Sequence, residues 1–488
     1  MSNVSPYHSV IIGAGPGGLT VAVGLAGFGK RVALIEKQHI GGDCTNVGCV
    51  PSKTLIHLAQ HAQAGQLPAG ILEKVRAKRD ALREEETAWI NSLDGLDVYS
   101  GQARIASPTQ VDIHSAAGEA QQLVTKNIII ATGAQARRIS VPGLPEAKTL
   151  TNDSLFEQED IPKHLAILGA GPIGTEMAFA FRQLGSAVSV IDMAEAPLRV
   201  VGKEASQVIA ASMQARDIAL YMAAKTLRYE PEDESLVLEQ HGREVSLSGV
   251  DKVLMAVGRV PATQDIGLEQ CGVKVERGGI PVNIHGATNI KGIYAIGDVS
   301  TASRFTHSAN AQGRRLVKHL ALPWLPTWGK EPSYPSATFS DPEVATIGAN
   351  EEALQQRYHP KVLMTLQVNL KDTDKGYTEG LEQGFVRIHA MRLTGRILAA
   401  TIVAPKASEM ISLLTLALYQ GISLYKLSNL VIPYPSLSEA IKKAADNYTF
   451  ATLPKLPQEL TTYLRYRWAK PAPLAEQTKP PKPREQTA

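Results

Sequence analysis

Cys44 and Cys49, five positions apart, are the residues of this sequence best suited to redox chemistry. They are two of only three cysteines in 488 residues, and they follow a nucleotide-binding signature that ends at Glu36. On a regular helix, residues five apart rise about 7.5 Å and point to different faces, whereas a disulfide needs Cα atoms within roughly 7 Å. A bond therefore requires a local distortion, which Gly48 and Pro51 permit. The pattern favours an electron relay, with two buried free thiols as the alternative.

The elements around these cysteines form an internal repeat. A buried strand, a Gly-x-Gly-x-x-Gly turn, a helix and a second strand ending in an acid occur from Gly13 to Glu36 and again from Gly169 to Asp192. This order is typical of a dinucleotide-binding βαβ unit, in which pyrophosphate lies at the helix N-terminus and the acid binds ribose hydroxyls. A glycine-rich turn alone can be structural. Two copies in full context predict two dinucleotides.

Further strands place small residues where the backbone could lie against a ligand. They are found at 127–134, 252–261 and 292–298. The polar run 151–160 and Pro162 are a plausible crossing into the second nucleotide unit.

The pattern changes from about Ser333. Short β-rich runs at 345–347, 362–370, 384–390 and 396–403 precede a helix-like segment at 408–418, which indicates an α+β domain. Residues 451–488 are rich in proline and basic residues, and the end from Ala469 is expected to be a disordered tail. The basic aromatic run Tyr463–Trp468 could lie on an anionic membrane surface, or pack against the body or a partner subunit.

Composition sets wider limits. The length suits about three domains, and 44% hydrophobic with 20% charged residues is ordinary for a soluble protein. A net charge of +3 is too small to indicate a nucleic-acid partner. Three cysteines indicate a reducing compartment. Because Met1 to His8 resembles no secretion signal and no apolar stretch is long enough to cross a bilayer, we expect a cytoplasmic protein.

A family resemblance covers about residues 9–450. It rests on the run Gly41–Lys53, both nucleotide signatures and several shorter motifs: Ala131-Thr132-Gly133, residues 256–261, 294–298, 339–345 and 435–440. In this order and spacing, the set resembles the pyridine nucleotide-disulfide oxidoreductases, the group of dihydrolipoamide dehydrogenase, glutathione reductase and mercuric reductase. The resemblance implies FAD in the first unit, NAD(P)H in the second, and a homodimer.

The implied fold class is α/β, with two Rossmann-like dinucleotide-binding domains and a C-terminal α+β dimerisation domain. Residues 1–150 and 279–328 would form the FAD-binding domain, and 151–278 the NAD(P)-binding domain. The dimerisation domain would span 329–450, followed by the Pro-rich basic-aromatic tail at 451–488.

The resemblance also implies residue roles. Cys49 would lie next to the flavin and form a charge-transfer complex with it, and Cys44 would be the interchange thiol exposed to substrate. Lys53 and Glu176 would form an ion pair near flavin N5. Glu36 would bind the FAD ribose and Asp298 the ribityl chain, while the helix that begins near His307 would face the flavin pyrimidine ring. The remaining expected cofactor-binding residues are Gly13, Gly15, Gly17, Gly18, Lys37, Gly42, Thr45, Ala131, Thr132, Gly133, Gly169, Gly171, Ile173, Gly174, Gly258, Arg259 and Gly297. No metal ligands are expected.

Charge favours NAD(H) over NADP(H) as the nicotinamide cofactor. Asp192 ends the second strand of its unit, where a carboxylate accepts from a free 2′-OH and repels a 2′-phosphate. Glu195 adds a second negative charge that favours NAD(H). Arg199 is close enough in sequence that its positive charge would instead favour the 2′-phosphate of NADP(H).

The C-terminal motif departs from the family pattern. Members that handle dithiols carry His-Pro-x-x-x-x-Glu, and here Tyr434 replaces the histidine while Glu439 remains. Thiol exchange needs a base that titrates near neutrality, and a tyrosine with a pKa of about 10 serves poorly. No cysteine follows Cys271, so a second redox pair is absent, and Cys271 is expected to be a packing residue.

We therefore expect an NADH-dependent flavoenzyme that passes electrons through FAD to a Cys44–Cys49 disulfide. Two kinds of electron acceptor are then possible. In the first, the enzyme carries out disulfide oxidoreduction of the dihydrolipoamide dehydrogenase type. In the second, it delivers electrons to a metal ion, quinone or oxidant that needs no proton from histidine, and the presence of Tyr434 favours this second hypothesis. The alternative function is a flavoprotein redox sensor or binding module that acts through the C-terminal tail.

Overall fold

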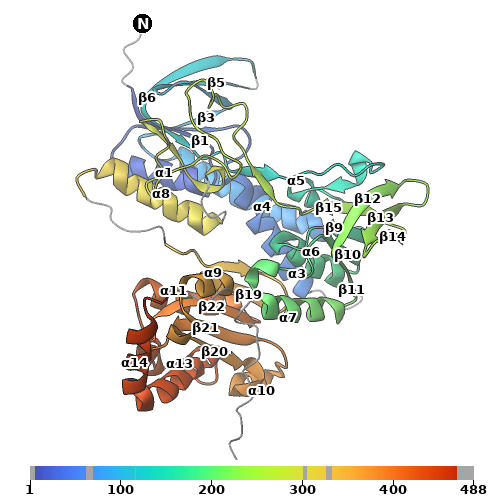
Figure 1. Ribbon diagram of the computed structural model, residues 1–488. Helices are drawn as coiled ribbons and strands as arrows, with labels where there is room; N and C mark the ends of the chain where they lie inside the picture. Colours follow the sequence, from blue (N-terminus) through green and yellow to red (C-terminus); the bar gives the residue numbers. More distant parts are fainter. Residues whose placement is uncertain (1–5, 62–69, 116, 301–304, 326–331, 470–488) are drawn as a thin grey trace, which may run out of the picture. The chain divides into compact units, whose positions relative to one another are not determined.

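The computed structural model describes residues 6–61, 70–115, 117–300, 305–325 and 332–469. The chain folds into two compact units (Figure 1). The first comprises Met1–Ala196 and Met213–Tyr334, and the second comprises Pro197–Ser212 and Pro335–Ala488.

A seven-stranded sheet organises the first half of the first unit. The central strand β1 is parallel to β2 and β6, and β17 returns late in the chain to pair with β6. Ile11 and Ile129 point to one face, where helices α1 and α8 cover them, while Val10 and Ile128 belong to the core on the other face. The strand order is β3-β2-β1-β6-β5-β4. The bounds are β1 Tyr7–Ile12, β2 Val32–Glu36, β3 Leu96–Ser100, β4 Gln102–Ser107, β5 Gln110–His114, β6 Ala120–Ile130, β17 Ile293–Ala295, α1 Pro16–Gly27 and α8 Thr306–Ala321.

The second half of this unit repeats the plan with a five-stranded parallel sheet. Its order is β11-β10-β9-β15-β8, and helix α6 follows β9 as α1 follows β1. Both helices begin with proline, which suits the first helical position. The bounds are β8 Thr149–Leu150, β9 His164–Leu168, α6 Pro172–Gln183, β10 Ala187–Asp192, β11 Ile218–Met222 and β15 Lys252–Met255. An antiparallel group (β12 Ala224–Glu230, β13 Ser235–Gln240, β14 Arg243–Leu247) and the pair β7 Ala134–Ala136 and β16 Arg259–Pro261 complete it.

Helices between β2 and β3 carry the cysteine run. They are α2 Gly42–Asn46, α3 Cys49–Gln60 and α4 Ile71–Asn91. Leu55 and Ala59 are buried on α3, as are Leu72 and Val75 on α4. These packed faces fix the N-terminus of α3, where Cys49 lies.

The second unit is built on an antiparallel sheet of order β18-β19-β22-β21-β20. Buried residues of α11 and α13, such as Leu414 and Ala444, share one core with sheet residues such as Ile388 and Ile402. The α+β character predicted for this region, and with it the fold class, is confirmed. The bounds are α7 Lys203–Gln214, whose last two residues are in the first unit, β18 Ser336–Thr338, β19 Glu343–Gly348, α9 Glu351–Arg357, β20 Leu363–Asn369, α10 Asp374–Glu379, β21 Phe385–Met391, β22 Ile397–Ala404, α11 Ala407–Tyr419, α12 Leu424–Ser428 and α13 Glu439–Thr452.

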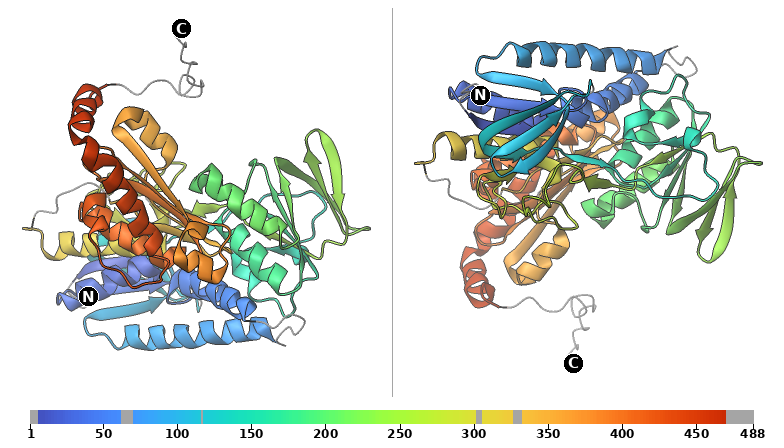
Figure 2. Two further views of the ribbon diagram at one scale, coloured as in Figure 1. Left: turned by 90° about the horizontal axis from the view of Figure 1, so that it is seen from below. Right: turned by 90° about the horizontal axis from the view of Figure 1, so that it is seen from above.

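The chain remains helical beyond residue 451, within the predicted proline-rich tail. A 3₁₀ turn at Leu453–Lys455 leads from α13 into α14, Leu456–Tyr466 (Figure 2). The segment predicted to be a disordered tail lies outside the described residues, apart from Ala469. Cys271 is partly buried against the core of the first sheet, as expected of a packing residue. Among the described residues, no helix has the length and apolar character needed to span a bilayer.

Candidate functional site: a dithiol between two nucleotide-binding turns

The two cysteines lie on either side of a break between short helices. Helix α2 ends at Asn46, Gly48 adopts φ −124° and ψ −110°, and α3 begins at Cys49. A Cβ on Gly48 would lie 2.8 Å from the carbonyl oxygen of Asp43, so a side chain there would clash. The predicted distortion is thus at Gly48. It is not at Pro51, which occupies the first turn of α3, where proline is tolerated.

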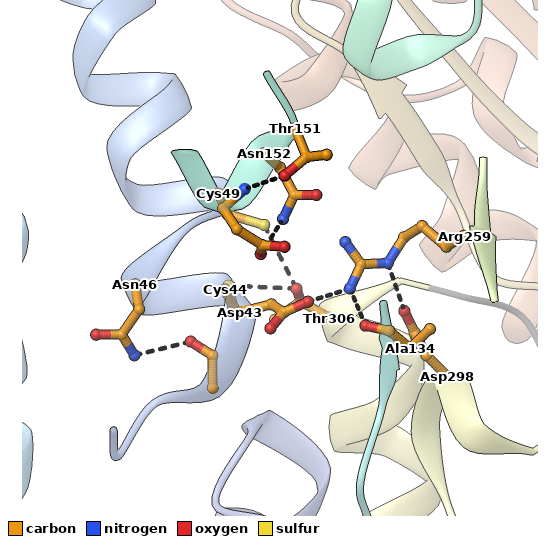
Figure 3. A network of polar contacts seen from close by, with 12 residues as sticks. Asp43, Cys44, Asn46, Cys49, Ala134, Thr151, Asn152, Arg259, Asp298 and Thr306 are labelled. Carbon is orange, nitrogen blue, oxygen red and sulfur yellow. Dashed lines mark hydrogen bonds and ion pairs between the residues drawn. The ribbon is translucent and has the colours of Figure 1, made fainter. Parts of the chain in front are cut away.

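One hydroxyl contacts both sulfur atoms. Thr306 Oγ1 is 3.3 Å from Cys44 Sγ and 3.5 Å from Cys49 Sγ (Figure 3). The structure holds the cysteines as two thiols and not as a disulfide. The break at Gly48 therefore brings the two sulfurs to one point, which a continuous helix would not do.

The pair divides its protons unequally. The pKa of Cys49 is lowered to about 6, chiefly because the Cys44 thiol donates to it, with the Thr306 hydroxyl and the Lys53 ammonium acting in the same direction. The pKa of Cys44 is raised, chiefly by its hydrogen bond to Cys49 and then by burial. Cys49 is also the first residue of α3, and a helix N-terminus stabilises a thiolate. At neutral pH the pair therefore holds one proton on Cys44 and one negative charge on Cys49.

An ion pair joins the helix of the cysteines to the second repeat. Lys53 Nζ on α3 is 2.7 Å from Glu176 Oε2 on α6. The Glu176 side chain is 6% exposed, and the Lys53 side chain is 34% exposed. Because a buried carboxylate is costly without a partner, this pair fixes the lysine beside the dithiol.

Arg259 connects the cysteine run to the two neighbouring strand ends. Its guanidinium donates to the Asp43 carboxylate and to the Ala134 carbonyl, and Nε is 3.8 Å from Asp298 Oδ2 (Figure 3). The sequence pattern predicts Arg259 and Asp298 as separate cofactor residues. The structure places both beside Asp43, next to Cys44.

The first glycine turn is shaped for close approach. A Cβ on Gly13 would lie 2.4 Å from the Ala131 carbonyl oxygen, and one on Gly18 would lie 1.9 Å from the Gly13 oxygen. By contrast, the nearest atom to a Cβ on Gly15 would be 4.0 Å away, at Gly42. Space therefore remains over the N-terminus of α1, where free N–H groups favour a phosphate.

The second turn repeats this geometry. A Cβ on Gly169 would lie 2.4 Å from the Ala256 oxygen and one on Gly174 would lie 1.9 Å from the Gly169 oxygen, while Gly171 has nothing within 4 Å. The two copies differ in the side chain two residues after these open glycines. A Cβ on Gly17 would lie 3.3 Å from Ile296, whereas its counterpart Ile173 is partly exposed at the start of α6.

The two closing acids hold matching positions. Glu36 accepts from the backbone N–H of Ala14 at 2.7 Å, and Asp192 accepts from that of Ala170 at 2.6 Å. Each also accepts from an N–H two residues further along the chain. Both carboxylates are thus fixed at the edge of a glycine turn, where a ribose would lie.

The other predicted cofactor residues fall into two groups. The backbone positions Gly42, Gly133, Gly258 and Gly297 have positive φ at turns around the site. Among the side chains, Thr45 donates to Glu86, Thr132 donates to the Ala262 carbonyl, Lys37 is exposed, and the His307 ring stacks on Phe305. Ala131 lies beneath the first turn.

In the second unit, the tyrosine that replaces the expected histidine is tied to an aspartate. The Tyr434 hydroxyl donates to Asp374 Oδ2 at 2.6 Å, and the side chain is 72% exposed. This hydrogen bond raises the pKa of Tyr434. Glu439 begins α13, and among the described residues its Oε2 atom is buried without a hydrogen-bond partner. The tyrosine hydroxyl therefore cannot serve as a base that titrates near neutrality.

Sequence reasoning missed three residues of the site. Thr306 directly precedes His307 at a helix start, and a hydroxyl there could have been noted as a partner for the thiols. Asp43 adjoins Cys44 within the cysteine run. Asp374 lies 60 positions before Tyr434, and no pattern connects the two.

The fold and site define a class: flavoproteins that exchange electrons between a nicotinamide and a cysteine pair. A model of the pyridine nucleotide-disulphide oxidoreductases matches residues 7–313, and a model of the dimerisation domain of that family matches residues 334–445. The chain belongs to the pyridine nucleotide-disulphide oxidoreductase family. It is an FAD-dependent oxidoreductase of the type that uses NAD(P)H, and it carries the homodimer-forming domain of the family.

Individual relatives agree with this assignment. The chain is 31% identical to dihydrolipoyl dehydrogenase 3 of Haloarcula marismortui over 461 residues, covering 90% of this chain and 95% of the relative. It is 31% identical to the dihydrolipoyl dehydrogenase of Bacillus subtilis over 465 residues, covering 90% and 97%.

Solved structures show the same fold. The Cu(II) complex of the HOCl-induced flavoprotein disulfide reductase RclA from Escherichia coli matches with a TM-score of 0.83 and 26% identity, covering 91% of this chain and all of RclA. LpdA from Mycobacterium tuberculosis matches with a TM-score of 0.80 and 27% identity, covering 90% and 99%. The open space over Gly15 and Gly171, each beside a fixed acid, suits two dinucleotides, FAD and NAD(P)H.

Proposed function

We propose that this protein is an NADH-dependent flavoenzyme that passes electrons through Cys44 and Cys49 to an acceptor that needs no proton from residue 434. A metal ion is the acceptor class we favour. The observation that carries this proposal is the hydrogen bond from Tyr434 to Asp374, because it ties up the hydroxyl at the position of the expected acid–base histidine.

The nucleotide turns supply the binding sites in this proposal. When FAD is bound, Gly15 and Glu36 would hold its pyrophosphate and ribose, and Asp298 would bind its ribityl chain. Gly171 and Asp192 would hold the pyrophosphate and ribose of NADH. Residues 1–150 and 279–328 then form the FAD-binding domain, 151–278 the NAD-binding domain and 329–450 the dimerisation domain. When bound, the two cofactors supply hydride transfer and a two-electron store.

The chain's own residues control the proton and the charge. Reducing a Cys44–Cys49 disulfide takes up two electrons and one proton, which leaves a thiol at Cys44 and a thiolate at Cys49. The lowered pKa of Cys49 and the raised pKa of Cys44 match this division. Lys53, held by Glu176, places a positive charge beside the thiolate.

Electron release to a metal ion balances without a further acid. The thiol and thiolate return to the disulfide, two metal ions each gain one electron, and the proton of Cys44 leaves to water. Reduction of a substrate disulfide would instead release a thiolate, whose protonation is the task of the family's histidine. RclA from Escherichia coli has been solved as a Cu(II) complex, which supports the metal-ion class.

The nicotinamide preference follows from Asp192. Its carboxylate is fixed by two backbone N–H groups at the end of β10, where it would accept from a ribose 2′-OH and repel a 2′-phosphate. We therefore propose NADH over NADPH. In the proposed dimer, the segment from Tyr434 to Glu439 faces Cys44 of the other subunit.

An acceptor screen tests the proposal. The anaerobic holoenzyme is titrated with NADH and then offered Cu(II), a quinone, lipoamide and oxidised glutathione in parallel. We expect turnover with the metal ion and slow turnover with both disulfides. Fast lipoamide reduction with no metal reduction would overturn the proposal. A kcat/KM for NADPH above that for NADH would overturn the cofactor preference.

A further inference from the structure

Helix α14 presents its leucines to solvent, while Glu459 and Tyr466 contact the domain. Leu456, Leu460 and Leu464 recur every four residues, so they lie on one face of the helix. Their exposed fractions are 45%, 47% and 53%, and Trp468, two residues past the end of the helix, is 83% exposed. A helix that simply packed on its domain would turn this face inward.

Glu459 and Tyr466, on the flank of α14 next to the leucine row, attach the helix to the rest of the second unit. Glu459 Oε1 is 3.4 Å from Arg392 Nη1, and the Glu459 side chain is 11% exposed. The Tyr466 ring stacks on His359 at 4.6 Å, and its hydroxyl accepts from Lys361 Nζ at 3.2 Å. Of the aromatic residues in the Tyr463–Trp468 run, Tyr466 is therefore held by the domain and Trp468 is exposed. The outward row is formed by leucines that the sequence analysis did not single out.

The exposed charged residues near the leucine row are all basic. Lys455, Arg465 and Arg467 are exposed, and Glu459 is the only acidic residue between positions 447 and 475. Because Glu459 is paired with Arg392, the described part of this segment has no carboxylate of its own beside these cations. The segment also lies beyond residue 445, where the match to the family's dimerisation domain ends.

We propose that α14 binds the surface of an anionic lipid membrane, with the leucine row (Leu456, Leu460 and Leu464) and Trp468 in the acyl boundary and the cations at the headgroups. A basic amphipathic helix with leucine and tryptophan on its apolar face has this property, and each cation near an anionic surface adds to the attraction.

A second copy of the chain fits this face less well. Pairing α14 with its own copy would bring Lys455, Arg465 and Arg467 of both chains together without acids between them. A helix of 11 residues is also only about 16 Å long, and its row of three leucines is small beside the roughly 1,600 Å² that a stable interface buries. Charge and size therefore both favour lipid.

Sedimentation of the full-length protein with vesicles tests the proposal. The probes are vesicles of phosphatidylglycerol mixed with phosphatidylcholine, and vesicles of phosphatidylcholine alone. We expect binding to the anionic vesicles that weakens as salt is raised, and little binding to the neutral ones. Leu464→Glu should lower binding at least tenfold, and Arg465→Gln with Arg467→Gln should remove most of the preference for anionic lipid.

Leu325→Glu is the matched control, because Leu325 is 52% exposed and belongs to the other unit. It should bind vesicles as the wild type does, and unchanged thermal unfolding should show that all variants fold. Absence of binding to anionic vesicles, or equal binding by Leu464→Glu, would overturn the proposal. A loss of oligomer mass in Leu464→Glu without vesicles would also overturn it and assign the face to a second copy. None of these outcomes depends on the identity of the electron acceptor.

Discussion

The dithiol of the first unit and the Tyr434 segment of the second unit differ in what they retain of the chemistry of their family. Around Cys44 and Cys49, a hydroxyl, a helix N-terminus and the ammonium of Lys53 all stabilise one thiolate. Around Tyr434, a hydrogen bond to Asp374 raises the pKa of a group that already titrates too high to act as a base near pH 7. Under the proposed function, electron entry does not depend on the group at position 434, and an acceptor that needs no proton would be reduced without it.

Removal of the thiolate should have the largest effect. Cys49→Ser should lower NADH-dependent metal reduction by roughly 10³-fold, because a hydroxyl cannot form the disulfide through which the electrons pass. The measurement is steady-state turnover with Cu(II). Cys271→Ser is the control and should retain wild-type turnover, since Cys271 is partly buried against the core of the first sheet. Turnover retained in Cys49→Ser would show that electrons leave before they reach the dithiol.

Breaking the ion pair should affect both stability and thiolate charge. Lys53→Met leaves Glu176 buried without its cation, and we expect a loss of about 1–2 kcal/mol in the free energy of unfolding, since the lysine is one-third exposed. It should also move the thiolate titration midpoint above its value near pH 6.

Glu176→Gln should shift the titration midpoint of the Cys49 thiolate in the opposite direction. It removes a negative charge that raises the pKa of Cys49, so the midpoint should move below that of the wild type. Both midpoints can be read from the ultraviolet absorbance of the thiolate as the pH of the reduced protein is raised. Shifts in the same direction for the two variants would contradict the electrostatic account.

Loss of the donor thiol should raise the same midpoint. In Cys44→Ala, Cys49 loses the hydrogen bond that is the largest cause of its lowered pKa. Reduced wild-type protein should form the thiolate as pH rises through about 6, and the variant should form it only at higher pH. Cys271→Ala should titrate as the wild type does through this range, because its own pKa is raised by burial.

The smallest effect should come from the tyrosine hydroxyl. Tyr434→Phe removes the bond to Asp374 from a largely exposed side chain, so metal reduction should change by less than about twofold. Turnover should also be independent of any ionisation at this position below pH 10, because the pKa of Tyr434 is raised. A tenfold loss in Tyr434→Phe would show that the hydroxyl takes part in turnover.

Much of the fold and part of the site could be predicted from the sequence, because local patterns carry them. The repeated glycine turns required strand, turn and helix in a fixed order, and the structure has β1–α1–β2 and β9–α6–β10 there. Contacts between segments far apart in the chain could not be predicted this way. Thr306 reaches the cysteines across more than 250 positions, and Asp374 reaches Tyr434 across 60. Helix α14 was missed because residues 451–488 were interpreted only as a proline-rich, basic-aromatic tail, although proline is tolerated in the first turn of a helix.

Restoring the histidine tests the central claim most directly. Dihydrolipoamide:NAD⁺ turnover is compared between the wild type and Tyr434→His, with Tyr425→His as a control at another exposed tyrosine of the same unit. Since a positioned acid–base group contributes roughly 10²-fold or more, we expect a gain of about that size in Tyr434→His alone, with Cu(II) reduction unchanged. High wild-type dihydrolipoamide turnover that the substitution does not alter would contradict the claim that the missing base directs electrons away from dithiol chemistry.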